Sequence, residues 1–168
     1  MIKTTNATLQ GLITGGLMIA ASLLIYQTKS SFDNNLQFIV YALYILGLAW
    51  TLHNFRIYSS KKKNFKQYFS HGFKCFVVVT LLMVAFTWAF MQLNPQMENE
   101  MAENTRREMM GSGNYTQAEI DSNVTKAKEY YTPMLISMAI FSYLLIGSVI
   151  TAALSAILLN LPKNTADA

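Results

Sequence analysis

Four long runs of apolar residues divide the chain. They cover residues 9–26, 36–52, 73–93 and 134–161. An α-helix needs about 20 residues to cross roughly 30 Å of hydrocarbon, at about 1.5 Å per residue. The runs contain no charged residue except Lys74, near the start of the third. They also lack the strict alternation of a membrane β-strand. The pattern therefore predicts an all-α integral membrane protein, with four transmembrane helices in a single membrane domain over residues 1–168.

A cleaved signal peptide is the alternative interpretation of residues 9–26. The segment before this run carries only Lys3, and no small-x-small cleavage motif follows Tyr26. The run is also longer than the apolar core of a typical signal peptide. We therefore interpret it as an uncleaved span.

The composition supports a membrane protein and narrows its chemistry. Charged residues make up 13% of the chain, against about 25% in an ordinary globular domain. The single cysteine, Cys75, excludes an intramolecular disulfide and a thiolate metal cluster. The two histidines have no neighbouring carboxylates with which to form a standard zinc site. We expect no metal and no cofactor.

The basic residues are concentrated in one link between the runs. Residues 53–72 contain five Lys or Arg and no acid, whereas residues 94–132 contain four basic and seven acidic residues. Short cytoplasmic loops are enriched in Lys and Arg. We therefore predict that residues 53–72 and both termini are cytoplasmic and that residues 94–132 are extracytoplasmic.

The long acidic link is predicted to form a helical hairpin, because connections of this length are rarely structureless. Asn94 followed by Pro95 is typical of a helix start, and Gly111 is a candidate helix end. Thr116 and Glu119 match a capping box at the start of a second helix. Pro133 is interpreted as the boundary between that helix and the fourth span.

The hairpin is also the candidate docking surface for a protein partner. Methionine-rich helix faces adapt readily to different partners. In the alternative interpretation, the apolar stripe packs within the hairpin or on the bilayer surface. The candidate docking residues are Met97, Met101, Ile120, Val124 and Tyr131.

The basic link is the candidate site for lipid headgroups. Phe65, Phe69, Phe73 and Phe76 fall on one helical face, as in an interfacial helix that leads into a span. Each lysine at this position contributes about 1 kcal/mol to the free energy of binding to an anionic membrane surface. The alternatives are a topology signal with an aromatic belt, or a specific nucleotide-sugar contact. A nucleic-acid partner is not expected. The candidate headgroup contacts are Arg56, Lys61, Lys62, Lys63, Lys66 and Lys74.

Small residues recur every four positions in the first and fourth runs. Such faces let membrane helices approach closely, so we expect these spans to pack through them, on each other or on a partner. The candidate packing residues are Gly11, Gly15, Gly16, Gly147, Ser148, Thr151, Ala152 and Ser155.

The sequence contains no recognisable catalytic motif, and no Asp, Glu or Arg lies within a run. Proton relays and ion-coupled transporters normally need buried ionisable groups. We therefore expect no catalytic residues. The leading hypothesis is a non-enzymatic membrane subunit or scaffold that assembles with a membrane partner. The alternative is an oligomeric small-solute or lipid transporter (a flippase) that uses the hydroxyl side chains of the spans.

The order of these features resembles a known family. The features are the glycines of the first span, Arg56 after the second, the aromatic and basic segment 64–73, the acidic hairpin and Pro133. Together they are similar to the four-span bacterial membrane proteins grouped as domain of unknown function 4199, found in the Bacteroidota. The resemblance implies a multi-pass protein of the bacterial cytoplasmic (inner) membrane and no assigned activity. It also suggests an accessory subunit of a polyprenyl-phosphate glycosyltransferase as a third possibility.

Overall fold

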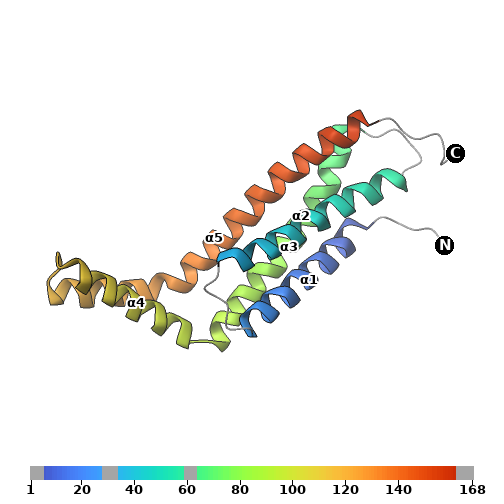
Figure 1. Cartoon of the computed structure of the whole chain (residues 1–168). Helices are drawn as coiled ribbons and strands as arrows, with labels where there is room; N and C mark the ends of the chain where they lie inside the picture. The colour runs from blue at the N-terminus through green and yellow to red at the C-terminus, as the bar shows by residue number, and fades with distance from the viewer. Residues whose placement is uncertain (1–5, 28–33, 59–63, 162–168) are drawn as a thin grey trace. The chain divides into compact units, whose positions relative to one another are not determined.

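The computed structural model describes residues 6–27, 34–58 and 64–161, and in these ranges all regular structure is helical. Figure 1 shows the five helices in chain order. They are α1 (Ala7–Gln27), α2 (Asn34–Ile57), α3 (Phe65–Leu93), α4 (Gln96–Ser112) and α5 (Gln117–Asn160). The predicted all-α fold is confirmed, and α1, α2, α3 and α5 are long and apolar enough to cross a membrane.

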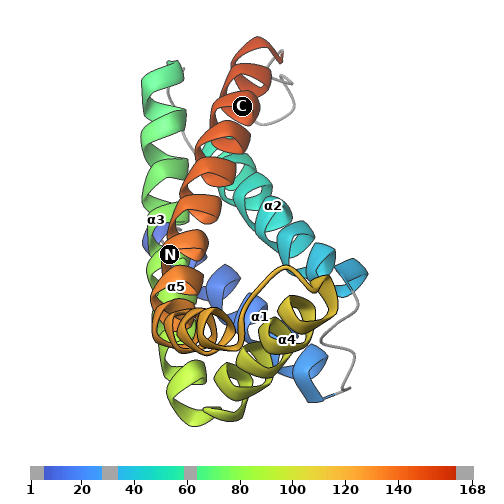
Figure 2. The same ribbon diagram turned by 90° about the vertical axis from the view of Figure 1, so that its left-hand side faces the viewer.

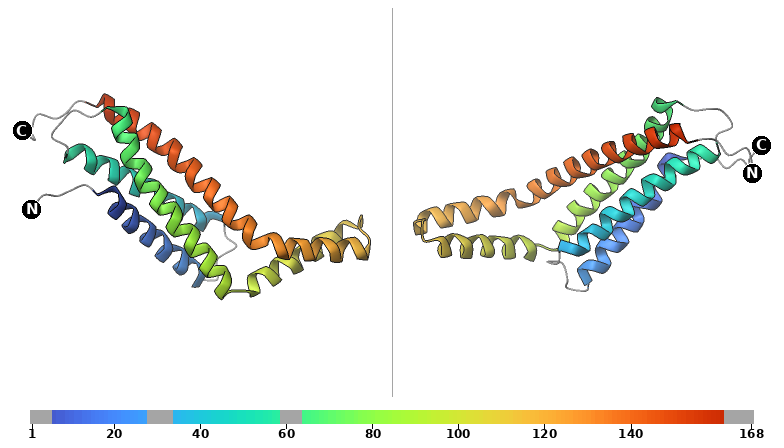
Figure 3. Two further views of the ribbon diagram at one scale, coloured as in Figure 1. Left: turned by 180° about the vertical axis from the view of Figure 1, so that it is seen from behind. Right: turned by 45° about the horizontal axis from the view of Figure 1, so that its top comes forward.

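The helices form two compact units. The four-helix unit comprises Met1–Met83 and Ser142–Ala168, and the hairpin unit comprises Val84–Phe141. Helices α3 and α5 contribute to both units. Within the four-helix unit, α1, α2, the first part of α3 and the last part of α5 lie side by side (Figures 2 and 3).

Helix α1 shows why this unit suits a lipid environment. The residues that it buries recur at intervals of three and four, and most are small or polar. They are Ala7, Gln10, Gly11, Thr14, Gly15 and Met18. Its leucines face outward, with Leu17 57% and Leu24 63% exposed. A helix in a soluble protein buries its large apolar side chains, whereas close packing of small residues is typical of helices in lipid.

Close contacts define the direction of the neighbouring helices. Gly11 lies against Cys75 of α3, and Gly15, one turn later, lies against Leu82. Helix α1 therefore runs in the same direction as α3. Between α3 and α5 the order of contacts is opposite. Gly72 of α3 contacts Thr151 of α5, and Phe76, which comes later in α3, contacts Gly147, which comes earlier in α5. Helices α3 and α5 are thus antiparallel.

The hairpin unit contains the expected turn, but its first helix ends later than predicted. Gly111 lies within α4, so its assignment as the helix end was wrong. The end is set by Gly113, which has a φ of 65° and donates its backbone N–H to the Met110 carbonyl at 3.3 Å. Helices commonly end at a residue with positive φ, and glycine adopts this conformation without a steric clash because it has no Cβ.

The predicted N-cap at Asn94 was also wrong. Pro95 occupies the N-cap position of α4, without a side-chain capping bond. The Asn94 amide donates instead to the Phe90 carbonyl at 2.8 Å, one turn back in α3. Its side chain therefore binds the end of the preceding helix.

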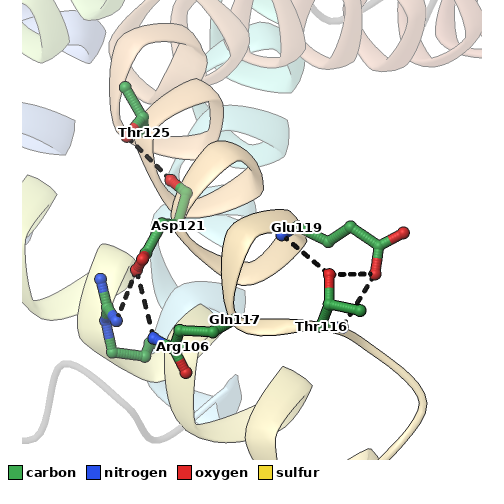
Figure 4. A network of polar contacts seen from close by, with 6 residues as sticks. All are labelled: Arg106, Thr116, Gln117, Glu119, Asp121 and Thr125. Carbon is green, nitrogen blue, oxygen red and sulfur yellow. Dashed lines mark hydrogen bonds and ion pairs between the residues drawn. The ribbon is translucent and has the colours of Figure 1, made fainter.

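The predicted capping box is present at the start of α5. The Thr116 backbone N–H donates to Glu119 Oε2 at 2.8 Å, and the Glu119 N–H donates to Thr116 Oγ1 at 3.4 Å (Figure 4). The two residues thus satisfy backbone donors that a helix start leaves unpaired.

Helix α5 continues through Pro133, where the sequence predicted a boundary between two helices. Proline has no backbone N–H, so one carbonyl of the preceding turn loses its usual partner. The helix nevertheless continues, and Ser137 donates its hydroxyl to the Pro133 carbonyl at 2.8 Å. The second hairpin helix and the fourth apolar run are therefore one element, whose apolar part begins after Pro133.

Candidate functional site

The interior of the four-helix unit is held by hydrogen bonds between neutral groups. Tyr44 of α2 is fully buried and donates its hydroxyl to the Tyr143 carbonyl of α5 at 2.8 Å. The two rings also meet edge to face, with centroids 5.6 Å apart. This pair joins two helices that are distant in the sequence and fixes their register.

Other buried hydroxyls bond within their own helix. Thr51 donates to the Gly47 carbonyl and Thr80 to the Phe76 carbonyl, both at 2.8 Å. Thr51 Oγ1 also lies 3.4 Å from the thiol of Cys75. Such bonds satisfy a polar group in lipid without requiring a ligand.

Some buried polar atoms have no partner among the described residues. The hydroxyls of Thr151 and Ser155 are both fully buried and unpaired, and Nε2 of His71 is likewise buried and unpaired. The His71 ring stacks on Phe55 of α2, with centroids 4.1 Å apart. Buried polar groups usually have a protein or water partner, so these three atoms mark the least satisfied part of the interior that the structure describes.

Charged and metal-binding groups are not part of this interior. Every buried polar side chain that the structure describes is uncharged: Gln10, Thr14, Thr51, Thr80, Thr151 and Ser155. Across the described ranges, three or more His, Cys, Asp or Glu side chains do not come together in a metal-binding group.

The candidate packing residues of α1 separate onto two faces. A Cβ added at Gly11 would lie 2.8 Å from the backbone oxygen of Cys75, and one at Gly15 would lie 2.7 Å from Leu82 Cδ1. Gly16 is exposed, and a Cβ there would meet nothing within 4 Å. Gly11 and Gly15 therefore lie against α3, while Gly16 faces outward.

The candidate residues of α5 differ in how deeply they are buried. Gly147, Thr151 and Ser155 are buried and form the inward row. Gly147 lies against Tyr44 and Phe76, so its neighbours belong to α2 and α3. Ser148 and Ala152 are half-buried beside that row.

Two packing glycines were missed from the sequence. Gly47 lies directly against the Thr14 side chain, and Gly72 lies against Thr151 and Leu52. Gly47 and Thr51 are four positions apart, but the spacing does not continue to a third small residue, and the residues four positions from Gly72 are Tyr68 and Phe76. Their position within or directly beside an apolar run was the sequence feature that could have identified the two glycines as packing residues.

The candidate lipid-contact residues lie in different surroundings. Lys66 and Lys74 are exposed on the first turns of α3. Arg56 donates from Nη2 to the Leu161 carbonyl at 3.2 Å, so it joins the ends of α2 and α5. The predicted contacts Lys61, Lys62 and Lys63 lie outside the described residues.

The predicted aromatic face is confirmed as a ladder along α3. The ring centroids are 6.0 Å apart for Phe65 and Phe69, 6.5 Å for Phe69 and Phe73, and 5.1 Å for Phe73 and Phe76. Phe65 and Phe73 are exposed, while Phe76 is buried. The ladder thus leads from the surface into the packed interior.

The side chains of the candidate docking residues are partly or fully buried in the hairpin unit. Ile120 is 4% exposed, while Met97, Met101, Val124 and Tyr131 are half-buried. This placement favours the alternative in which the stripe packs within the hairpin unit.

Polar contacts also join the two helices of the hairpin. Arg106 Nη1 lies 2.8 Å from Asp121 Oδ1 (Figure 4), and Thr132 donates to Glu98 Oε1 at 2.6 Å. These contacts pair the beginning and the middle of α4 with the part of α5 that lies opposite.

Comparison with known proteins identifies a family but assigns no activity. No curated protein and no solved structure matches the chain. The family described as "Protein of unknown function (DUF4199)" matches residues 9–160, from the first apolar run to the end of α5. The chain therefore belongs to the DUF4199 family.

Proposed function

We propose that the protein is a non-enzymatic membrane subunit, or scaffold, that assembles with a second membrane protein through the outward face of α1. The observation that carries this proposal is the separation of small residues onto two faces of α1. One face packs on α3, and the other has no partner among the residues that the structure describes.

The unused face is centred on Gly16 and Ala20. Both residues are exposed, and the space beside Gly16 is open. They are one turn apart, with the exposed Leu9 and Leu23 before and after them in the same direction. In lipid, a strip of small residues lets the backbone of another helix approach closely and gain dispersion contacts. The occupant that fits is therefore a membrane-spanning helix of a partner.

The interior supports a structural role. The buried polar side chains of the described helices are uncharged, and several bond to carbonyls of their own helix. Catalysis of proton transfer and ion-coupled transport normally depends on ionisable groups in such positions.

The location that we propose is the cytoplasmic membrane of a bacterium. The basic link 53–72 and both termini would face the cytoplasm, and the acidic hairpin 94–132 would lie outside. The excess of basic residues in the first link supports this orientation.

The test is purification of the tagged full-length protein from its native membrane in mild detergent, with Gly16→Leu as the variant. The added side chain fills the outward strip, so we expect a stoichiometric partner to be reduced about tenfold, as a loss of about 1.4 kcal/mol predicts. Ala153→Leu is the matched control, since it enlarges an exposed small residue on α5. Equal recovery of the partner with both variants would contradict the proposal, as would a wild-type protein that purifies as a monomer alone.

An oligomeric transporter is the second candidate, and it is supported by the unpaired hydroxyls of Thr151 and Ser155. A neutral polar solute or lipid headgroup would satisfy them during passage. In proteoliposomes, Thr151→Val with Ser155→Ala would then abolish a flux that the wild-type protein shows. Absence of flux of any lipid or solute tested with the wild-type protein counts against this candidate.

A further inference from the structure

We propose that the first three turns of α3 bind the headgroup of an anionic phospholipid through the row formed by Lys66, Ser70 and Lys74. This role is separate from the assembly face on α1. The three residues form a row of donors beside the aromatic ladder of Phe65, Phe69 and Phe73.

The row lies on the outward face of the helix. Lys66, Ser70 and Lys74 are spaced four residues apart and are all exposed, whereas Tyr68 and Gly72 between them are buried. Eight residues of helix separate the two lysines by about 12 Å along the axis. Flexible four-carbon stems carry the two ammonium groups, so both can approach one phosphate beside the Ser70 hydroxyl.

The aromatic ladder supplies the apolar side of the site. Phe65 and Phe73 are 42% and 47% exposed, and successive rings are in contact along the helix. Aromatic side chains are favoured where the hydrocarbon meets the headgroups. The ladder is therefore suited to contact the glycerol and upper acyl carbons of the lipid whose phosphate the lysines hold.

The length of α3 places this row at the level of the headgroups. Its 29 residues extend about 43 Å, which exceeds the roughly 30 Å of hydrocarbon by about 13 Å. The apolar run 73–93 is the part of α3 that would cross the hydrocarbon. Lys66 and Ser70 then lie in the headgroup layer, and Lys74 at its inner boundary can extend its ammonium group outward.

Charge complementarity selects an anionic lipid. The sequence from residue 34 to residue 97 contains no Asp or Glu. Within the described part of the chain, Lys66 and Lys74 have no salt bridge, and the ion pairs are those of Arg106 and Arg107 in the hairpin. A zwitterionic lipid carries its own cation beside the phosphate, so it competes less well for these lysines than an anionic lipid does.

The experiment uses the delipidated full-length protein in detergent. Phosphatidylglycerol or phosphatidylcholine is added, and native mass spectrometry counts the lipids that remain bound. We expect the wild-type protein to retain phosphatidylglycerol preferentially. K66Q/K74Q should lower its retention about thirtyfold and leave phosphatidylcholine unchanged, since each lysine near the surface contributes about 1 kcal/mol to anionic-lipid binding.

Two variants separate a specific site from general charge. K126Q/K128Q removes the same charge from exposed positions in the hairpin and should leave phosphatidylglycerol retention unchanged. K66R/K74R keeps the charge and should retain the lipid. An unchanged melting temperature in detergent shows that K66Q/K74Q is folded. The proposal is overturned if K66Q/K74Q retains the lipid like the wild type, if K126Q/K128Q loses as much, or if the wild-type protein shows no preference.

Discussion

Individual glycines in the four-helix unit differ in what surrounds them, although the sequence presents them alike. Gly147 lies where α5 meets Tyr44 and Phe76, and a Cβ there would lie 2.8 Å from Phe76 Cγ. Around Gly16 the space is open for at least 4 Å. The same substitution therefore has opposite consequences at the two positions.

Gly147→Ala is expected to destabilise the protein by about 2 kcal/mol, because overpacking forces a shift in helices that are already in contact. Gly16→Ala is expected to be neutral or stabilising by up to about 1 kcal/mol, because alanine favours a helix more than glycine does. Unfolding of both variants in detergent, followed by circular dichroism, measures the difference. A Gly147→Ala protein as stable as the wild type would show that α5 can move away from α2 and α3 without cost.

The same contrast shows what residue patterns could predict. The fourfold repeat singled out Gly11, Gly15 and Gly147, which the structure places at close contacts. The repeat could not separate them from Gly16, because one glycine beside another differs only in the direction that it faces. That direction depends on where the neighbouring helices lie.

At the scale of single elements, the start of α5 is set by local hydrogen bonds. The Thr116 backbone N–H and hydroxyl both donate to Glu119 Oε2, at 2.8 and 2.9 Å. These bonds favour the ionised carboxylate, so they lower the pKa of Glu119 below its usual 4.5, the backbone bond contributing most. The capping contribution is therefore complete above pH 4.5 and is lost as the pH falls through the lowered pKa.

The chemical shift of the Thr116 amide proton should accordingly follow a titration whose midpoint lies below pH 4.5. NMR of the protein in detergent measures it. Thr116→Ala removes the hydroxyl donor and should move the midpoint upward, while Glu119→Gln should abolish the titration. A wild-type midpoint at or above 4.5 would mean that the capping box does not form in solution.

Helix α5 shows the limit of such local signals. Pro133 predicted a boundary, because proline removes a hydrogen bond and crowds the preceding turn. The helix nevertheless continues through it as one 44-residue element, and proline is tolerated in membrane helices where other groups satisfy the freed backbone. The unfavourable effect of a single proline therefore did not determine where α5 ends.

At the scale of the whole molecule, the orientation in the membrane can be tested with the natural cysteine in place. Cys75 is fully buried, so the wild-type protein should not react with a membrane-impermeant maleimide. Asn123→Cys places an exposed thiol in the hairpin, and Tyr58→Cys places one at the end of α2. We expect intact cells to label Asn123→Cys only, and Tyr58→Cys to be labelled after permeabilisation, because basic links remain in the cytoplasm. The reverse pattern would contradict the proposed orientation.

The sequence by itself determined the four long apolar helices, the helical hairpin, the capping box and the aromatic ladder. Each of these depends on residues within a few positions of one another, or on the length of a single run, and helical periodicity relates such residues directly. Only the tertiary structure decided that Tyr44 bonds the Tyr143 carbonyl and that Arg56 bonds the Leu161 carbonyl. Those pairs are 99 and 105 residues apart. Contacts at such separations arise from how helices pack and in which register, and packing depends on the shapes of all the facing side chains together.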